Sequence, residues 1–154
     1  MSFFSRKMDY ALLVLSHLGK NQQGSSAREI STRYAISRPF VANILKTLCH
    51  HGFLESHRGV HGGYVLKRKP ESVSLAEVMN AIDEPFSLME CSTETDTLRC
   101  SIKPFCTIHT GMAEVHEKIK GILQSVTLGE ILSPESKTGG RFLGLELVSS
   151  DQVE

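Results

Sequence analysis

The sequence predicts a mainly α-helical winged helix-turn-helix, with a small β-hairpin wing and a long C-terminal dimerisation helix. Apolar residues recur at helical spacing through residues 6–50, two β-prone runs then flank a glycine-rich tip, and a heptad pattern runs from residue 108 onward. The expected domains are a winged helix-turn-helix domain at 1–85, a cysteine-containing loop at 86–107, the dimerisation helix at 108–132 and a flexible tail at 133–154.

Three helices are expected at the start of the chain. The first covers residues 6–20, and a polar run ends it. Ser25 or Ser26 is expected to cap the second helix, 27–34, and Ser37 the third. One face of the third helix is apolar and is expected to pack on the first two, through Val41, Ile44, Leu45 and Leu48. Short helices in this order predict a helix-turn-helix.

A β-hairpin, the wing, is expected next. The β-prone runs 53–58 and 64–68 enclose a tip that contains Gly59, Gly62 and Gly63. A further short helix over residues 75–82 is expected to pack on this domain. Residues between Glu90 and Pro104 are polar and aperiodic, which predicts a loop.

Charge is divided unevenly along a chain whose formal net charge is zero. Residues 1–70 carry 11 Lys and Arg against 3 Asp and Glu, a net charge of +8, whereas residues 71–154 carry 6 against 14, a net charge of −8. A basic region of this kind is typical of a nucleic-acid-binding surface, although basic residues can also simply solvate helix faces. The residues expected to contact double-stranded DNA are Ser26, Ser37, Arg38, Asn43, Lys46, His57, Arg58, His61 and Gly62.

Three cysteines, Cys91, Cys100 and Cys106, are followed by His109. The sequence has no signal-peptide pattern and no apolar run long enough to span a membrane, so we expect a cytoplasmic protein. Disulfides are rare in a reducing cytoplasm, which favours metal binding or thiol chemistry for clustered cysteines. Cys49, in the third helix, is expected to be a small packing residue instead.

The heptad pattern predicts an interface between two copies of the chain. A helix with this apolar stripe needs a partner, and a second copy would also present a second DNA-binding domain. The alternative is an amphipathic helix that lies on its own domain. The expected interface residues are Ile108, Met112, Val115, Ile119, Ile122 and Val126.

Together, the first helix from Arg6 to Leu18, the helix-turn-helix, the wing sequence 56–64 and the three cysteines before a long helix resemble the Rrf family of iron-sulfur transcription regulators. The likeness is closest to its Suf-system members and covers about residues 6–132. It implies a homodimer that binds a palindromic operator, with an iron-sulfur cluster on Cys91, Cys100 and Cys106.

The resemblance leaves the fourth ligand and the cluster type open. Asp9 matches a carboxylate that nitric-oxide-sensing members supply from the partner subunit, and His109 matches the histidine of the IscR branch. Eight residues separate Cys91 from Cys100, which departs from the usual family spacing, so both 2Fe-2S and 4Fe-4S clusters remain possible.

The resulting hypothesis is a DNA-binding transcriptional regulator, a repressor, whose operator affinity an iron-sulfur cluster controls in response to iron-sulfur or iron status, nitric oxide or redox state. A zinc-stabilised or thiol-switch winged-helix regulator and a protein-docking module without a cluster are the alternatives. An enzyme is not expected, because the sequence has no nucleophile-base set and no phosphate-binding glycine loop before a helix.

Overall fold

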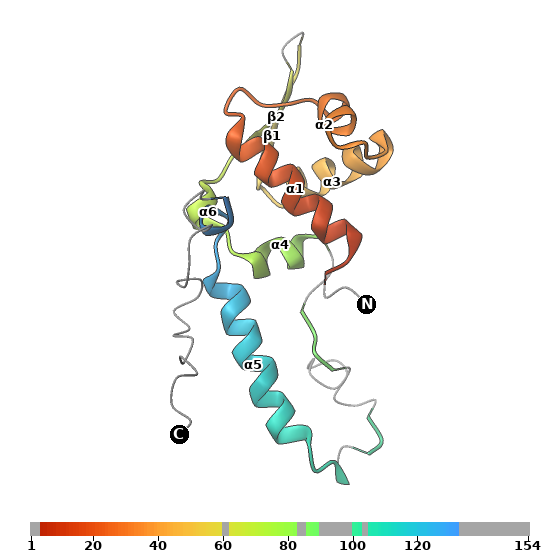
Figure 1. The fold of residues 1–154 in the computed structure, drawn as a ribbon, viewed down its shortest axis with the longest axis vertical. Coiled ribbons are helices and arrows are strands. Elements are labelled where there is room, and N and C mark those ends of the chain that lie inside the picture. The colour runs from red at the N-terminus through yellow and green to blue at the C-terminus, as the bar shows by residue number, and fades with distance from the viewer. Residues whose placement is uncertain (1–3, 60–61, 83–85, 90–99, 103–104, 133–154) are drawn as a thin grey trace, which may run out of the picture.

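A computed structural model of the chain describes residues 4–59, 62–82, 86–89, 100–102 and 105–132. Helices dominate, and one antiparallel hairpin extends from the helical body (Figure 1). The mainly α winged-helix fold is therefore confirmed. In chain order the elements are α1 (Arg6–Lys20), α2 (Ala27–Tyr34), α3 (Arg38–His50), β1 (Leu54–His57), β2 (Gly63–Leu66), the 3-10 turn η1 (Pro70–Ser72), α4 (Leu75–Ala81), α5 (His109–Ser125) and α6 (Leu128–Leu132).

The core lies where α1, α2 and α3 meet. Its apolar side chains are almost fully removed from solvent, and burial of each one is worth about 1.5–3 kcal/mol. The capping box of Ser26 and Glu29 begins α2, and Ala35, with a φ of 52°, ends it. Ser37 occupies the expected N-cap position of α3, but its side chain makes no cap hydrogen bond. The core side chains of these helices include Val14, Leu15, Leu18, Ile30, Val41, Ile44, Leu45 and Leu48.

The wing is joined to the loop between α1 and α2. Strands β1 and β2 pair in antiparallel register from Leu54 with Leu66 to His57 with Gly63. The amide of Ser25 donates to the Tyr64 carbonyl at 3.1 Å, and the Tyr64 amide donates back at 2.9 Å. These two hydrogen bonds therefore hold the start of β2 against the start of α2.

Two contacts tie α4 to the rest of the domain. Arg68, after β2, donates to Glu77 of α4, with 2.8 Å between Nη1 and Oε1. Lys7 of α1 donates from Nζ to the carbonyl of Ile82, at the end of α4, across 2.6 Å. A cation beside a C-terminal carbonyl also opposes the negative end of the helix dipole. These contacts hold both ends of α4 against the winged domain.

The C-terminal helix differs from the expected range 108–132. Helix α5 ends at Ser125, because Val126 is extended. Thr127 then caps the start of α6, its hydroxyl oxygen accepting from the Glu130 amide at 3.3 Å. Backbone hydrogen bonds tie this break to the winged domain, from the Leu75 amide to Val126 at 2.9 Å and from the Leu128 amide to Val73 at 2.8 Å. Val126 is 4% exposed, so this chain already covers a side chain expected at the dimer interface.

Candidate functional site

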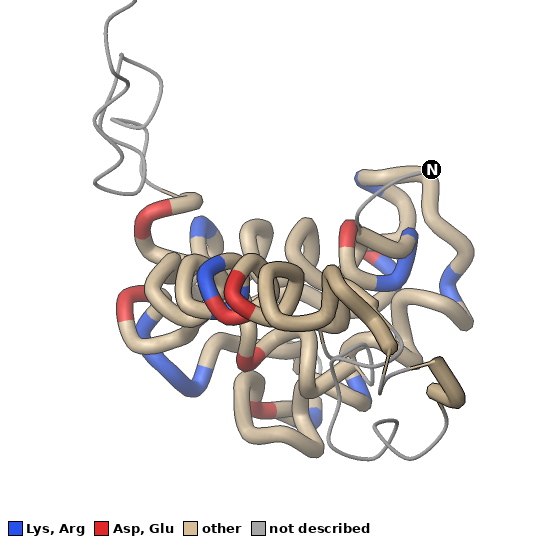
Figure 2. The backbone as a smooth tube through the Cα atoms, turned by 90° about the horizontal axis from the view of Figure 1, so that it is seen from below, with Lys and Arg blue, Asp and Glu red and all other residues tan. Residues whose placement is uncertain are grey.

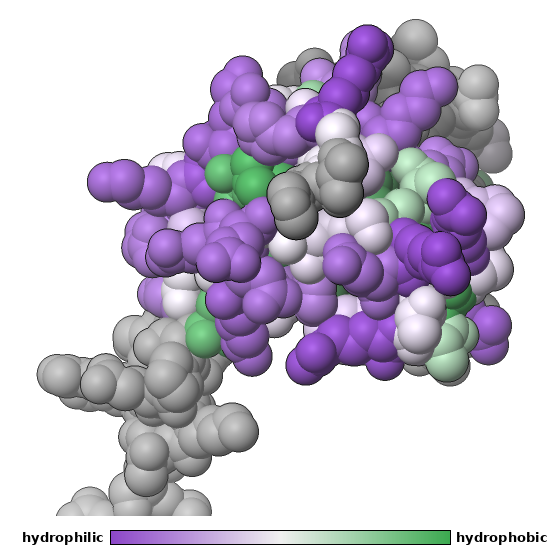
Figure 3. Space-filling model, turned by 90° about the horizontal axis from the view of Figure 1, so that it is seen from above, coloured by the Kyte–Doolittle hydropathy of each residue, from purple (hydrophilic) through white to green (hydrophobic). Residues whose placement is uncertain are grey.

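The outer face of α3 carries polar side chains that have no ion-pair partner in the described part of the chain. Arg38, Asn43 and Lys46 are all exposed, while the opposite face of the helix is buried in the core. Ser37 is also exposed, and its hydroxyl is not used as a cap. Seen from the hairpin end, the surface is mostly hydrophilic (Figure 3). This face can offer cations and amide groups to phosphates and base edges.

The tip of the wing depends on glycine. A Cβ on Gly62 would lie 2.6 Å from the His57 carbonyl oxygen and 2.8 Å from that of Gly59. The Gly62 amide donates to the Gly59 carbonyl at 2.9 Å, and Gly59 has a φ of +119°. His57 and Arg58 are exposed beside this turn, and His61 lies outside the described residues.

Replacing Gly62 with Ala is expected to distort the wing and to weaken binding to duplex DNA. The atoms that a methyl group would meet belong to the backbone, so they cannot move aside cheaply. A lost groove contact costs about 1–3 kcal/mol. Electrophoretic mobility at fixed salt measures the effect. Gly121→Ala is the control, because its Cβ would meet nothing within 4 Å and should leave DNA affinity unchanged. Equal affinities for both variants would contradict a role for the wing tip.

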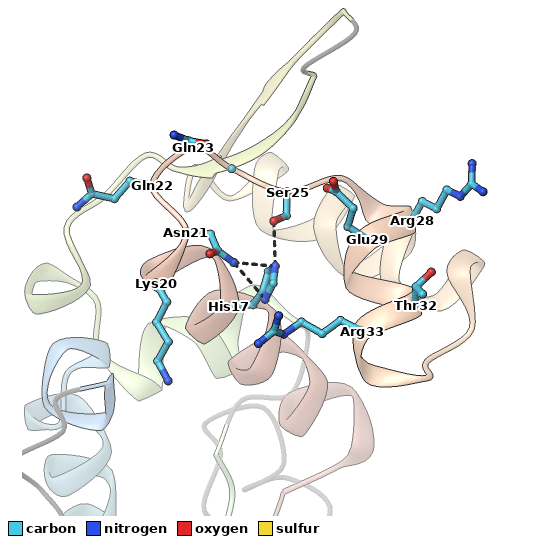
Figure 4. A pocket seen from close by; sticks show the side chains of 11 residues that line it. His17, Lys20, Asn21, Gln22, Gln23, Ser25, Arg28, Glu29, Thr32 and Arg33 are labelled. Atoms are coloured by element: carbon cyan, nitrogen blue, oxygen red, sulfur yellow. Dashed lines mark hydrogen bonds between the residues drawn. The ribbon is translucent and has the colours of Figure 1, made fainter.

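His17 joins α1 to α2 and to the loop between these two helices. It is 6% exposed, with Nε2 2.9 Å from Ser25 Oγ and Nδ1 3.2 Å from Tyr34 Oη. Asn21 Nδ2 lies 3.1 Å from Nε2 (Figure 4). Burial and then the charge of Arg33 lower the pKa of His17. The neutral ring therefore bridges three segments of the DNA-binding domain.

Acidification is expected to destabilise the domain through His17. Because the folded pKa lies below the ordinary value, the unfolded chain takes up the proton first, and stability falls as the pH drops below about 6.5. Urea titrations at about pH 7.5 and about pH 5.5 measure the change in free energy of unfolding. The loss of unfolding free energy between the two pH values should be smaller in His17→Gln. It should be unchanged in His50→Gln, which removes an exposed histidine. The same pH dependence in all three proteins would refute this assignment.

Two of the described donors of the cysteine region, Cys106 and His109, lie just before and at the start of α5. Cys100 and Cys106 are free and half-buried, and His109 is the first residue of the helix. Cys91 lies outside the described residues. Within the described ranges, no three His, Cys, Asp or Glu side chains come together as a metal site. Asp9 is exposed in the first turn of α1, which lies beside the end of α4, whereas the start of α5 is the end of that helix farthest from the winged domain (Figure 1).

The side chains of the predicted apolar stripe of α5 are only partly exposed to solvent. Ile108 and Val115 are 64% and 42% exposed, whereas Ile119 packs against the core of the winged domain. Met112 and Ile122 are half-buried. Charged residues of both signs lie elsewhere along the helix, with Glu117 Oε1 3.6 Å from Lys120 Nζ (Figure 2). The end of α5 nearest the cysteines thus retains most of its exposed apolar surface.

Sequence reasoning missed the two buried histidines as organising residues. His17 follows the buried Val14 by three residues, which is helical spacing, so its position on the buried face was detectable. His116 of α5 is 5% exposed and receives a hydrogen bond from the Leu88 amide. Its partner is 28 residues away in sequence, and no local signal indicates that pairing. Cys49 is half-buried as expected, and burial raises the pKa of its thiol.

The helix-turn-helix, the hairpin and the polar outer face of α3 define a winged-helix DNA-binding protein. Residues 4–134 match the Rrf2 family, described as "Iron-dependent Transcriptional regulator". The chain belongs to this family of transcriptional regulators, and so it is a DNA-binding regulator and not an enzyme. In the described part of the chain, no helix is both long enough and apolar enough to cross a membrane.

Individual relatives agree with this assignment. The chain is 28% identical to the transcriptional regulator NsrR of Geobacillus kaustophilus, over 80% of this chain and 85% of that protein. It is 30% identical to IscR of Klebsiella pneumoniae, over 68% of this chain and 63% of that protein. The structure of CymR, the global cysteine regulator of Bacillus subtilis, shares the fold, with a TM-score of 0.64 and 22% identity over 90% of this chain and all of that chain.

Proposed function

We propose that this protein is a homodimeric repressor whose affinity for a palindromic operator is controlled by an iron-sulfur cluster, so that it senses iron-sulfur or iron status, nitric oxide or redox state. The observation that carries this proposal is the pair of free, half-buried cysteines, Cys100 and Cys106, in the segment that leads into α5, which His109 begins. They occur in a member of a family described as iron-dependent.

The chemistry of the donor set fits an iron-sulfur cluster. Cys91, Cys100 and Cys106 would supply thiolates, which such clusters prefer. The fourth ligand would be His109 or Asp9 of the partner subunit. Asp9 lies in the first turn of α1, and the resemblance to nitric-oxide-sensing members implies that this carboxylate would come from the partner subunit. The cluster, as 2Fe-2S or 4Fe-4S, would supply the redox-sensitive bond between the cysteine loop and its surroundings.

The chain's own residues would carry the response to DNA. Ser26, at the start of α2, and the exposed residues of α3 would face the groove and phosphates, with the wing beside them. The exposed apolar residues of α5 would join two subunits and set the separation of the two α3 helices. A coupling of about 1–3 kcal/mol between ligand state and this separation would change operator affinity by about 5- to 150-fold.

Purification without oxygen tests this proposal. We expect a coloured protein with iron and acid-labile sulfide, and loss of both in Cys91→Ala and Cys106→Ala. Cys49→Ala is the matched control, because this thiol packs against the core and should not affect the colour. Whichever of Asp9→Ala and His109→Ala alters the absorption spectrum names the fourth ligand. A colourless protein with zinc, or without metal, would overturn the cluster proposal in favour of a zinc-stabilised or thiol-switch regulator.

A further inference from the structure

The four described residues at the start of the cysteine-containing loop, 86–89, are held against α5 by His116. Residues 86–89 form neither helix nor strand. The Leu88 amide nevertheless donates to His116 Nδ1 at 3.3 Å. The Phe86 ring stacks on the imidazole, with 5.0 Å between ring centroids and 20° between the planes. A polar contact and a ring contact therefore converge on one buried side chain.

The hydrogen bond requires one form of the imidazole. Because Nδ1 accepts from the Leu88 amide, the ring proton lies on Nε2. Glu117 Oε1 is 3.9 Å from Nε2, on the side that carries this proton. A leucine at position 116 could fill similar space, but it would leave the Leu88 amide without its acceptor. An unpaired, partly buried amide is costly, so the apolar replacement would favour release of the segment.

The position of His116 on α5 limits how far Cys91 can lie from the start of that helix. His109 and His116 are seven residues apart, which places them on the same helix face about 10 Å apart along the axis. Residue 91 follows Leu88 by three residues, and three residues of chain span at most about 11 Å. Anchoring Leu88 at His116 therefore keeps Cys91 within three residues of a point on α5 that lies two turns from His109.

We propose that His116 is a positioning residue that fixes residues 86–89 on α5 so that Cys91 can join Cys100 and Cys106 in one ligand set. This inference rests on the proposed cluster function. His116 is not itself a ligand in this assignment, because its Nδ1 is used by the Leu88 amide and it lies two helical turns from His109.

Two variants at one position separate hydrogen bonding from packing. His116→Leu removes the acceptor, whereas His116→Asn keeps an oxygen close to the place of Nδ1. We expect amide exchange at Leu88 in the metal-free protein to speed up about tenfold in His116→Leu and to stay near the wild-type rate in His116→Asn. The anaerobically purified proteins should lose their visible absorption about tenfold faster in air with Leu than with Asn. Gln124→Leu, at an exposed position of the same helix, controls for helix substitution.

The outcomes are distinguishable. Unchanged exchange at Leu88 in His116→Leu would show that the anchor does not exist, and the inference would be wrong. Faster exchange with unaltered cluster lifetime would show an anchor that does not position Cys91, which also overturns the inference. A wild-type protein without iron would defeat the proposed function and this assignment with it, while the exchange experiment would still establish whether His116 holds Leu88.

Discussion

Val115→Glu is expected to convert the proposed dimer into a monomer and to abolish tight operator binding. Val115 is 42% exposed on α5, so the isolated subunit tolerates a charge there, but a dimer would have to bury it without a partner. Such burial costs several kcal/mol, and each 1.4 kcal/mol weakens association about tenfold. Analytical ultracentrifugation measures the oligomeric state, and mobility shift with a palindromic duplex measures binding.

Gln124→Glu is the matched control for this experiment. It introduces the same charge into the same helix, but nine residues from Val115, on the opposite face. This variant should remain dimeric, and both variants should keep the thermal unfolding of a folded winged domain. A dimeric Val115→Glu protein would show that the exposed apolar residues of α5 do not form the interface.

Leu45→Ala and Lys46→Ala should separate folding from DNA binding at neighbouring positions of α3. Leu45 is fully buried, and its truncation should cost about 2–5 kcal/mol of unfolding free energy, a large share of the usual total of about 5–15 kcal/mol. Lys46 is exposed, and its removal should leave stability within about 0.5 kcal/mol while weakening DNA binding.

Urea denaturation and DNA titration over a range of salt concentrations measure the two effects. The logarithm of the binding constant should fall less steeply with salt in Lys46→Ala, by a slope of about one, because one fewer counterion is released. An unchanged slope would exclude Lys46 from phosphate contact. A Leu45→Ala protein as stable as the wild type would contradict the assignment of this residue to the core.

Local signals account for most of the winged domain. The capping pair Ser26 and Glu29 defines the start of α2, and helical spacing of apolar residues defines the buried face of α3. The predicted end of the C-terminal helix was wrong. The heptad pattern continues through Val126, but backbone pairing with the winged domain interrupts the helix there. A capping signal at Thr127 and Glu130 was present in the sequence and outweighs that periodicity.

The site was predictable only where a residue's role follows from its own neighbours. Exposed Arg38, Asn43 and Lys46 follow from the pattern of one helix. The pairing of His116 with Leu88 depends on the folded path of the chain, and so does the pairing of His17 with Ser25. Cysteine ligation stays a prediction, since Cys91 lies outside the described residues.

The backbone pairing at Val126 has a mechanical consequence. Helix α5 has 17 residues and is therefore about 25 Å long, and hydrogen bonds to Val73 and Leu75 secure the chain where the helix ends. Helix α5 is therefore a lever that is fixed at its C-terminal end, and the cysteine region precedes its N-terminal end. On this length, a displacement of about 2 Å at the far end corresponds to a rotation of about 5° at the root. A small rearrangement around the thiols would thus reach the DNA-binding domain as a change of angle.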